Sequence, residues 1–246
     1  MKSSASQGVG WWCGARQSAG PVAHPSHLWQ EGLCTPHRLH SRGTMSEAMP
    51  IHKPILISQH CPMLVPHTPD VLDLPIVAYW DGTPCANTRL HGVVTLGVED
   101  EGLWLTASLP HQECPCVPAR PPHTRVANLW EYDVVECFVA GAEGYLEVEL
   151  GAGGHFLVLD FAAPRVRRNA YEAFVPRMTF EPCLEGKPAW RSSILIPWSM
   201  VPVHVQGVNA YVISRHHYLC YHPLPGPKPD FHQPVRFPSV RLEGRA

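Results

Sequence analysis

Charged residues are scarce in this sequence. Of 246 residues, 19 are Lys or Arg and 21 are Asp or Glu, which is 16% of the chain and leaves a formal net charge of −2. Proteins that bind nucleic acid or anionic membranes usually carry a marked basic excess. The sequence also lacks any run of roughly 18 apolar residues, the length that a membrane-spanning helix needs. We therefore expect neither nucleic acid nor a membrane among its partners.

Paired cysteine spacings are missing as well. The nine cysteines form an odd and irregular set, which does not resemble a disulfide framework. The segment CPC at 114–116 and the two histidines at 216–217 lack the paired spacing of a structural zinc site. The N-terminus has no apolar run of the secretory kind. These absences favour free thiols and a reducing compartment, the cytoplasm.

Long helical patterns are almost absent, and proline is abundant, with 27 residues. Proline ends helices and is kept out of central strands. Residues 1–44 show neither helical nor strand periodicity, which predicts a disordered extension. A second methionine, Met45, raises the hypothesis that this extension is spurious or an alternative start. We interpret residues 45–75 as a linker that could include a first strand, and residues 76–242 as the folded domain.

Short apolar or alternating runs recur from residue 76 onward. Their lengths of about 5–10 residues and the intervening Gly, Pro, Asp and Asn are typical of strands joined by hairpins and loops. Hydrophobic residues make up 45% of the chain, enough for a compact core. The pattern therefore predicts an all-β fold, an antiparallel β-sandwich.

Carboxylates interrupt one predicted strand, in ANLWEYDVVECF at 127–138. Glu136 shares a face with the apolar positions two residues to either side. We interpret it as a buried acceptor paired with an arginine such as Arg191 or Arg215. Asp133 points to the opposite face and is the better candidate for a ligand or metal contact.

A second predicted strand, YLEVEL at 145–150, alternates apolar and acidic residues. Its apolar face is expected to lie on the core, and Glu147 and Glu149 are typical of a solvated face. An adjacent acidic strand would repel these two carboxylates unless cations or hydroxyl donors lay between them. That alternative keeps a functional role open for both residues.

Seven motifs then occur in a recognisable order. They are YWDGTP (79–84), VEDEGLWLTASL (98–109), NLWEYDVVECFV (128–139), YLEVELGAGG (145–154), WRSSILIPWSM (190–200), GVNAYVISR (207–215) and KPDFHQPVRF (228–237). This series resembles the family-9 carbohydrate-binding module and its DOMON-related relatives. A closer resemblance is to a vertebrate and microbial family that shares LWEYDVVECF, YLEVEL and KPDFH and has no assigned activity. The resemblance covers roughly residues 76–242.

The resemblance implies an immunoglobulin-like or jelly-roll β-sandwich that holds the end of a sugar chain. Calcium is bound in some relatives, and no other cofactor is expected. Proteins bind sugars by stacking their apolar faces on aromatic rings, while carboxylates, amides and arginines bond the hydroxyls. On that basis the candidate ligand-binding residues are Trp80, Asn128, Trp130, Asp133, Glu147, Glu149, Arg215 and Asp230. Trp190 and Trp198 are further candidate platforms, although the setting of Trp198 after a proline is more typical of packing.

Two functions from different classes stay open. The first is a non-catalytic module whose partner is a carbohydrate or small-molecule ligand, a glycan or small polyol. The second is a stand-alone intracellular enzyme that acts on a sugar or related metabolite, with carboxylates such as Asp133 and Glu147 as acid and base. The sequence has no nucleophile elbow, Gly-rich phosphate loop or metalloprotease motif, which favours the first.

A haem site, as in some relatives of this sandwich, would need an axial Met and His, and neither Met178 nor Met200 has a recognisable haem-ligand context.

Overall fold

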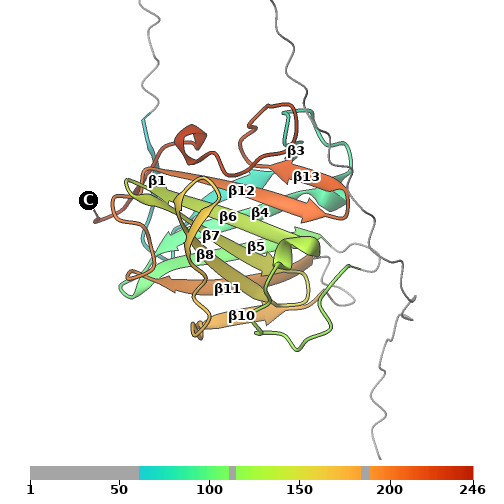
Figure 1. Cartoon of the computed structure of the whole chain (residues 1–246), viewed down its shortest axis with the longest axis horizontal. Helices are drawn as coiled ribbons and strands as arrows, with labels where there is room; N and C mark the ends of the chain where they lie inside the picture. The colour runs from blue at the N-terminus through green and yellow to red at the C-terminus, as the bar shows by residue number, and fades with distance from the viewer. Residues whose placement is uncertain (1–60, 111–114, 184–188, 246) are drawn as a thin grey trace, which may run out of the picture. The chain divides into compact units, whose positions relative to one another are not determined.

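The computed structural model describes residues 61–110, 115–183 and 189–245 (Figure 1). These residues belong to one compact unit, Leu56–Ala246. The predictions for residues 1–44, and for the linker as far as residue 60, lie outside the described residues. The described part consists of strands and three short 3-10 turns, with no α-helix. No helix in it has the length and apolar character that crossing a membrane requires. The predicted all-β class is confirmed.

The first sheet of the described chain has five strands, each antiparallel to its neighbours. In the order in which they lie side by side, they are β10 (Met178–Glu181), β11 (Ala189–Pro197), β5 (Gly102–Pro110), β4 (Gly92–Val98) and β2 (Leu72–Ile76). Three of these strands, β4, β5 and β11, are rich in alternating or β-branched apolar residues, as the sequence pattern indicated.

The second sheet has seven strands, again all antiparallel within the described residues. Side by side, they are β3 (Ala78–Tyr79), β13 (His217–Cys220), β12 (Gly207–Ser214), β6 (Val134–Gly141), β7 (Gly144–Gly151), β8 (Phe156–Ala163) and β9 (Val166–Asn169). The remaining elements are the parallel pair β1 (Met63–Val65) and β14 (Val240–Leu242) and the 3-10 turns η1 (Thr88–Leu90), η2 (Leu129–Glu131) and η3 (Pro234–Arg236).

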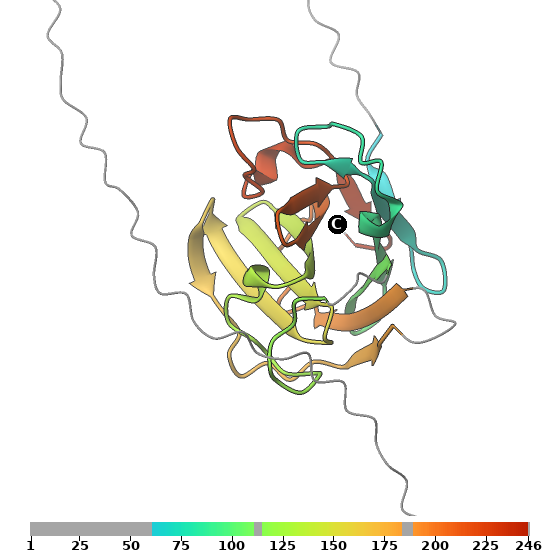
Figure 2. The ribbon, with the colours of Figure 1, turned by 90° about the vertical axis from the view of Figure 1, so that its right-hand side faces the viewer.

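The two sheets pack face to face across an apolar core (Figure 2). Leu96, Leu105 and Ile194 from the five-stranded sheet join one cluster with Val135 and Val148 from the seven-stranded sheet, and each is at most 1% exposed. Successive side chains of a strand point to opposite faces, so every second residue of these strands reaches this core. The predicted antiparallel β-sandwich is therefore confirmed.

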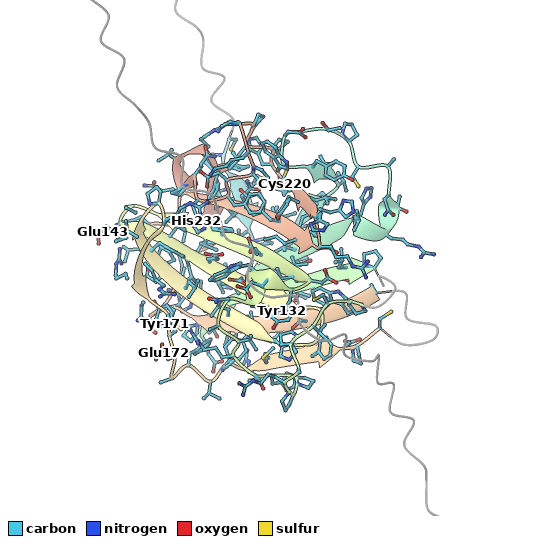
Figure 3. The ribbon with its side chains drawn as sticks, turned by 45° about the vertical axis from the view of Figure 1, so that its right-hand side comes forward. Tyr132, Glu143, Tyr171, Glu172, Cys220 and His232 are labelled. Carbon is cyan, nitrogen blue, oxygen red and sulfur yellow. The ribbon has the colours of Figure 1, made fainter. Side chains whose placement is uncertain are left out.

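The outer face of the seven-stranded sheet is buried as well. A second apolar cluster joins Phe138 and Tyr145 from this face with Phe231 and Phe237, which follow the last strand of the sheet. The segment 221–238 that carries these two residues is rich in proline, so it cannot extend a strand ladder, and it packs over the sheet instead. Figure 3 labels His232 of this segment beside the strands. This cover turns a surface that would otherwise be solvated into the wall of a cavity.

Candidate functional site: an acidic and aromatic cavity on the outer sheet face

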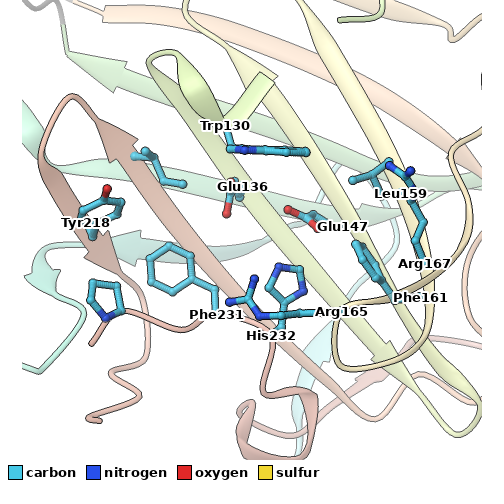
Figure 4. A pocket seen from close by; sticks show the side chains of 12 residues that line it. Trp130, Glu136, Glu147, Leu159, Phe161, Arg165, Arg167, Tyr218, Phe231 and His232 are labelled. Atoms are coloured by element: carbon cyan, nitrogen blue, oxygen red, sulfur yellow. The ribbon is translucent and has the colours of Figure 1, made fainter. Parts of the chain in front are cut away.

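A cavity of about 490 Å³ lies on the outer face of the seven-stranded sheet (Figure 4). Its volume falls within the range of about 300–1,000 Å³ that is typical of small-molecule sites. Strands β6, β7, β8, β9, β12 and β13, the turn η2 and the segment after β13 all contribute to it. The lining residues are Trp130, Glu136, Glu147, Leu159, Phe161, Arg165, Arg167, Ile213, Tyr218, Pro229, Phe231 and His232.

Three glutamates, Glu136, Glu147 and Glu149, form what we call the glutamate cluster. Glu136 of β6 lies directly opposite Glu149 of β7, and Glu147 is two residues from Glu149 on the same face. Their side chains are 2%, 4% and 0% exposed, and a carboxylate oxygen from each lies within 4.8 Å of the other two. Glu136 and Glu147 line the cavity, whereas Glu149 is buried beside them.

The hairpin between β6 and β7 fixes this juxtaposition. Gly141 pairs with Gly144 across a two-residue turn, and a shift of one residue would turn every side chain to the opposite face. Gly144 has a φ of 139°, and a Cβ there would lie 2.1 Å from the carbonyl oxygen of Phe161. Only glycine fits this position. The turn chemistry therefore sets which carboxyl groups meet.

Burial controls the protonation of the glutamate cluster. It raises the pKa of Glu147 from 4.5 to about 8, against an opposing effect of the Arg165 charge. Burial also raises the pKa of Glu136 and of Glu149 well above the ordinary value, and the charges of neighbouring glutamates add to both shifts. The backbone N–H of Trp130 is near enough to lower the pKa of Glu149 slightly, without reaching hydrogen-bond geometry. At neutral pH the cluster therefore holds protons unless a positive charge compensates it.

Arg165 brings a positive charge to the cavity from the turn between β8 and β9. It has a φ of 60°, and its backbone N–H donates to the hydroxyl oxygen of Tyr145 at 3.0 Å. Its guanidinium donates to the carboxylate of Asp230 at 2.7 Å. Burial opposes ionisation of Asp230, but the hydrogen bond and charge of Arg165 outweigh it and leave the pKa of this carboxyl lowered. The ion pair thus positions Arg165 at the rim.

His232 is held in its neutral form. Burial and the Arg165 charge lower its pKa from 6.5 to about 4. Its Nδ1 lies 2.6 Å from the hydroxyl of Tyr145. In the tautomer in which the Tyr145 hydroxyl donates to Nδ1, the Nε2 atom of His232 carries the ring proton. The cavity therefore gains a neutral N–H donor.

Aromatic rings form two sides of the cavity. Trp130 in η2 is 39% exposed, and Figure 4 shows it on one side of Glu136 and Glu147, with Phe231 and His232 on the other. Asn128 begins η2 with a φ of 57°, a conformation that asparagine tolerates better than most residues. Phe231 stacks on Tyr211 at a centroid distance of 3.9 Å, which immobilises it. A planar apolar ligand face would therefore have aromatic rings on either side of it.

The structure brings together half of the predicted ligand residues. Trp130 and Glu147 line the cavity, Glu149 lies in the glutamate cluster, and Asp230 anchors Arg165 at the rim. The described cavity lining does not include the other four. Trp80 is half-buried after β3, Asn128 and Arg215 are exposed in turns, and Asp133 faces a separate cavity with Trp190.

Asp133 and Glu136 lie in surroundings that differ from those expected. Asp133 is 1% exposed and accepts a hydrogen bond from the backbone N–H of Cys116 at 2.7 Å, so it closes a loop onto the start of β6. Glu136 instead lines the main cavity, where the charge of Arg165 opposes the rise of its pKa. Arg191 lies on β11 of the other sheet. Strand alternation placed the two side chains on opposite faces correctly, and a ligand contact of Asp133 stays a prediction.

The expectation of a solvated acidic face on β7 is also wrong. Tyr145, Glu147 and Glu149 are all at most 4% exposed, because the C-terminal segment and η2 cover them. The adjacent acidic strand that would repel them does exist, in the form of Glu136 on β6.

Among the tryptophans outside the cavity, Trp190 is 3% exposed in the core between the sheets. The indole N–H of Trp198 donates to backbone carbonyls of the β4–β5 turn, and Arg245 stacks on its ring at 3.5 Å. Both tryptophans therefore pack within the fold and do not line the cavity.

Sequence reasoning missed several lining residues. They are Phe161, Arg165, Arg167, Tyr218, Phe231 and His232. Phe231 and His232 lie within the KPDFH motif. The position of this motif after the last predicted strand is the sequence feature that could have indicated their role. Nothing in the local pattern of the β8–β9 hairpin pointed to Arg165.

The chain is similar to several known proteins. Human UPF0462 protein C4orf33 is 32% identical over 173 residues, which cover 65% of this chain and 83% of the relative. The homologue from Mus musculus is 33% identical over 174 residues, with coverage of 66% and 87%. The homologue from Danio rerio is 28% identical over 184 residues, with coverage of 70% and 90%. No family model matches the chain.

Among solved structures, a protein from Bacteroides uniformis described as a "putative carbohydrate-binding protein" has a similar fold. Its TM-score is 0.55 at 17% sequence identity, and the match covers 74% of this chain and 97% of that protein. Likeness at this level shows the shared β-sandwich. The likeness to the curated relatives goes further, because identity above 30% extends over more than four fifths of their length. The chain therefore belongs to the UPF0462 family.

Proposed function

We propose that this protein is a non-catalytic binding module that holds a glycan end or a small polyol in the cavity on the outer sheet face. One observation carries the proposal: a partly exposed indole ring and buried carboxyl groups line the same cavity. Stacking on Trp130 would hold the apolar face of a sugar ring. The polar groups beside it would bond the hydroxyls.

The protonation state of the cavity suits neutral hydroxyl ligands. A sugar hydroxyl both donates and accepts hydrogen bonds, and a protonated carboxyl group can do the same. Glu147, with a pKa of about 8, supplies that form at neutral pH, and burial raises the pKa of Glu136 in the same direction. Arg165 and the Nε2 proton of His232 add donors, so the site can address several hydroxyls at once. The description of the Bacteroides uniformis protein is consistent with such a ligand class.

The direct test is calorimetric titration of the full chain with a panel of neutral hexoses, short oligosaccharides and hexitols. We expect at least one class to bind, and to raise the melting temperature in proportion to its affinity. Hexuronic acids and small aliphatic acids serve as controls for simple attraction to the arginines. A chain that binds no member of the neutral panel at millimolar concentration would exclude this function.

A second candidate function is acid catalysis on a glycoside, which the pKa of Glu147 favours. A carboxyl group that titrates at about 8 is protonated at neutral pH, as a general acid must be. Glycoside hydrolysis also needs a second carboxylate that stays ionised, and the pKa of the neighbouring Glu136 is raised too. Binding is therefore the better supported reading. Release of nitrophenol from aryl glycosides, lost in Glu147→Gln, would reverse that ranking.

A further inference from the structure

Glu149 poses a problem that sugar binding does not solve. It is 0% exposed, and neither of its carboxyl oxygens has a hydrogen-bond partner among the described residues. Buried polar groups are nearly always paired, and each exception calls for an explanation. Glu149 does not line the cavity, so a sugar bound there would not supply both of its partners directly. Its carboxyl group faces Glu136 and Glu147 instead.

The charges around the glutamate cluster do not balance. The three glutamates and Asp230 contribute four carboxyl groups to this region, whereas the described lining offers two guanidinium groups, those of Arg165 and Arg167. The guanidinium of Arg165 already pairs with Asp230 at 2.7 Å. If all four carboxyl groups were ionised, two negative charges would remain, which is the charge that one divalent cation neutralises.

The geometry of the cluster accommodates a calcium-sized cation. A carboxylate oxygen from each of the three glutamates lies within 4.8 Å of the other two. Oxygen ligands on opposite sides of calcium are up to about 5 Å apart, since each bond is about 2.3–2.6 Å, so calcium fits within this spacing. The donors are all hard oxygens, without the imidazole or thiolate that zinc and copper prefer.

We propose that the glutamate cluster binds a calcium-sized divalent cation beneath the cavity, with Glu136, Glu147 and Glu149 as its protein ligands. The unpartnered oxygens of Glu149 then become metal ligands, and the cation screens the repulsion between facing carboxylates on β6 and β7. Calcium takes six to eight oxygens, so several positions remain for water or for hydroxyls of a cavity ligand. This inference goes beyond the proposed sugar binding and does not depend on it. With the cation bound, the three carboxylates are ionised and accept hydrogen bonds from a sugar, whereas the metal-free cluster holds protons.

Terbium luminescence tests the site with the metal alone. The full chain is first stripped with a chelator, then titrated with Tb³⁺ while tryptophan is excited. Trp130 lies beside the glutamate cluster, so bound Tb³⁺ should give sensitised emission, which added Ca²⁺ should reverse. Trp130→Phe should lower the emission but leave the calorimetric affinity for Ca²⁺ unchanged. Unchanged emission from Trp130→Phe would place the metal elsewhere and overturn the assignment.

Substitution of the ligands completes the test. Glu149→Gln and Glu136→Gln should each weaken Ca²⁺ binding at least about tenfold, since even indirect supports of a metal site cost that much. Glu143→Gln, in the exposed β6–β7 turn, is the matched control and should bind as the parent does. Melting curves show whether each variant folds, and Glu147→Gln replaces any that does not.

Two further results would overturn the proposal. One is a parent chain that binds neither Tb³⁺ nor Ca²⁺ at millimolar concentration. The other is folded glutamine variants that bind Ca²⁺ with the affinity of the parent. No sugar is present in these measurements, so their failure is separate from a failure of the proposed function.

Discussion

The two faces of the seven-stranded sheet are equally buried but chemically opposite. Toward the five-stranded sheet, β6 and β7 present apolar residues such as Val135 and Val148, each at most 1% exposed. On the outer face, the neighbouring positions on the same two strands hold Glu136, Glu147 and Glu149. Burying apolar side chains stabilises the fold, whereas burying carboxyl groups opposes it. The inner face thus holds the sandwich together, and the outer face retains groups that need another explanation, which binding chemistry provides.

The largest effect is expected from an inner-face truncation on β7. Leu146→Ala removes a side chain that is 0% exposed in the core between the sheets, and should lower the free energy of unfolding by about 2–5 kcal/mol. Urea denaturation measures this directly. The matched outer-face change, Glu147→Gln, should shift stability by less than about 1 kcal/mol when metal is chelated, because burial already favours an uncharged side chain there. Equal losses in both variants would mean that the two faces do not differ as described.

The fold was readable from the sequence because its signal is local. Alternation and turn residues predicted strands within 127–138 and at 145–150, where β6 and β7 lie, and the pattern of YLEVEL placed Leu146 and Val148 on the core side, where they lie. Alternation, however, says only that two side chains share a face. It cannot say whether a distant segment covers that face.

The candidate site was therefore only half predictable. Asp133 and Glu136 were correctly placed on opposite faces, yet the choice of ligand face depended on the packing of residues 221–238 over the sheet. A turn with a positive φ at Arg165 places that residue at the cavity, and a hydrogen bond with Tyr145 holds His232 there. Both are consequences of tertiary structure that no short motif encodes.

Only substitutions on the outer face of the seven-stranded sheet should change the affinity for a sugar ligand. Trp130→Ala removes the exposed ring that lines the cavity and should weaken sugar binding by about 1–3 kcal/mol, with little change in melting temperature. Trp198→Ala is the control of equal size, since its ring packs against Arg245 away from the cavity. Titration of both variants with the same sugar separates the two cases. Loss of affinity in Trp198→Ala, with Trp130→Ala unchanged, would move the binding site away from the outer face.

The loss of folding stability at low pH should also arise from a residue on the outer face, His232. The pKa of His232 is lowered from 6.5 to about 4, so the unfolded chain takes up a proton that the folded chain does not. The stability that His232 contributes is complete above pH 6.5 and is lost as the pH falls toward 4, by at most about 1.4 kcal/mol per pH unit. His232→Gln retains an acceptor for Tyr145 and removes the titration, so its unfolding free energy should depend less steeply on pH in this window. Identical pH profiles for parent and variant would contradict the assignment.

The smallest effect is expected at the rim, where the outer face meets solvent. The Arg165–Asp230 pair is short at 2.7 Å, but its side chains are 61% and 39% exposed, and ion pairs at such exposure contribute about 0–1 kcal/mol. Asp230→Asn should therefore change the free energy of unfolding by less than about 1 kcal/mol, and the difference should shrink further in high salt. Its effect on sugar affinity should be of similar size, because Arg165 loses its anchor but keeps the backbone bond to Tyr145. Denaturation and titration at low and high salt measure both quantities. A loss comparable to that of Leu146→Ala would show that the rim, and not the inner face, supports the sandwich.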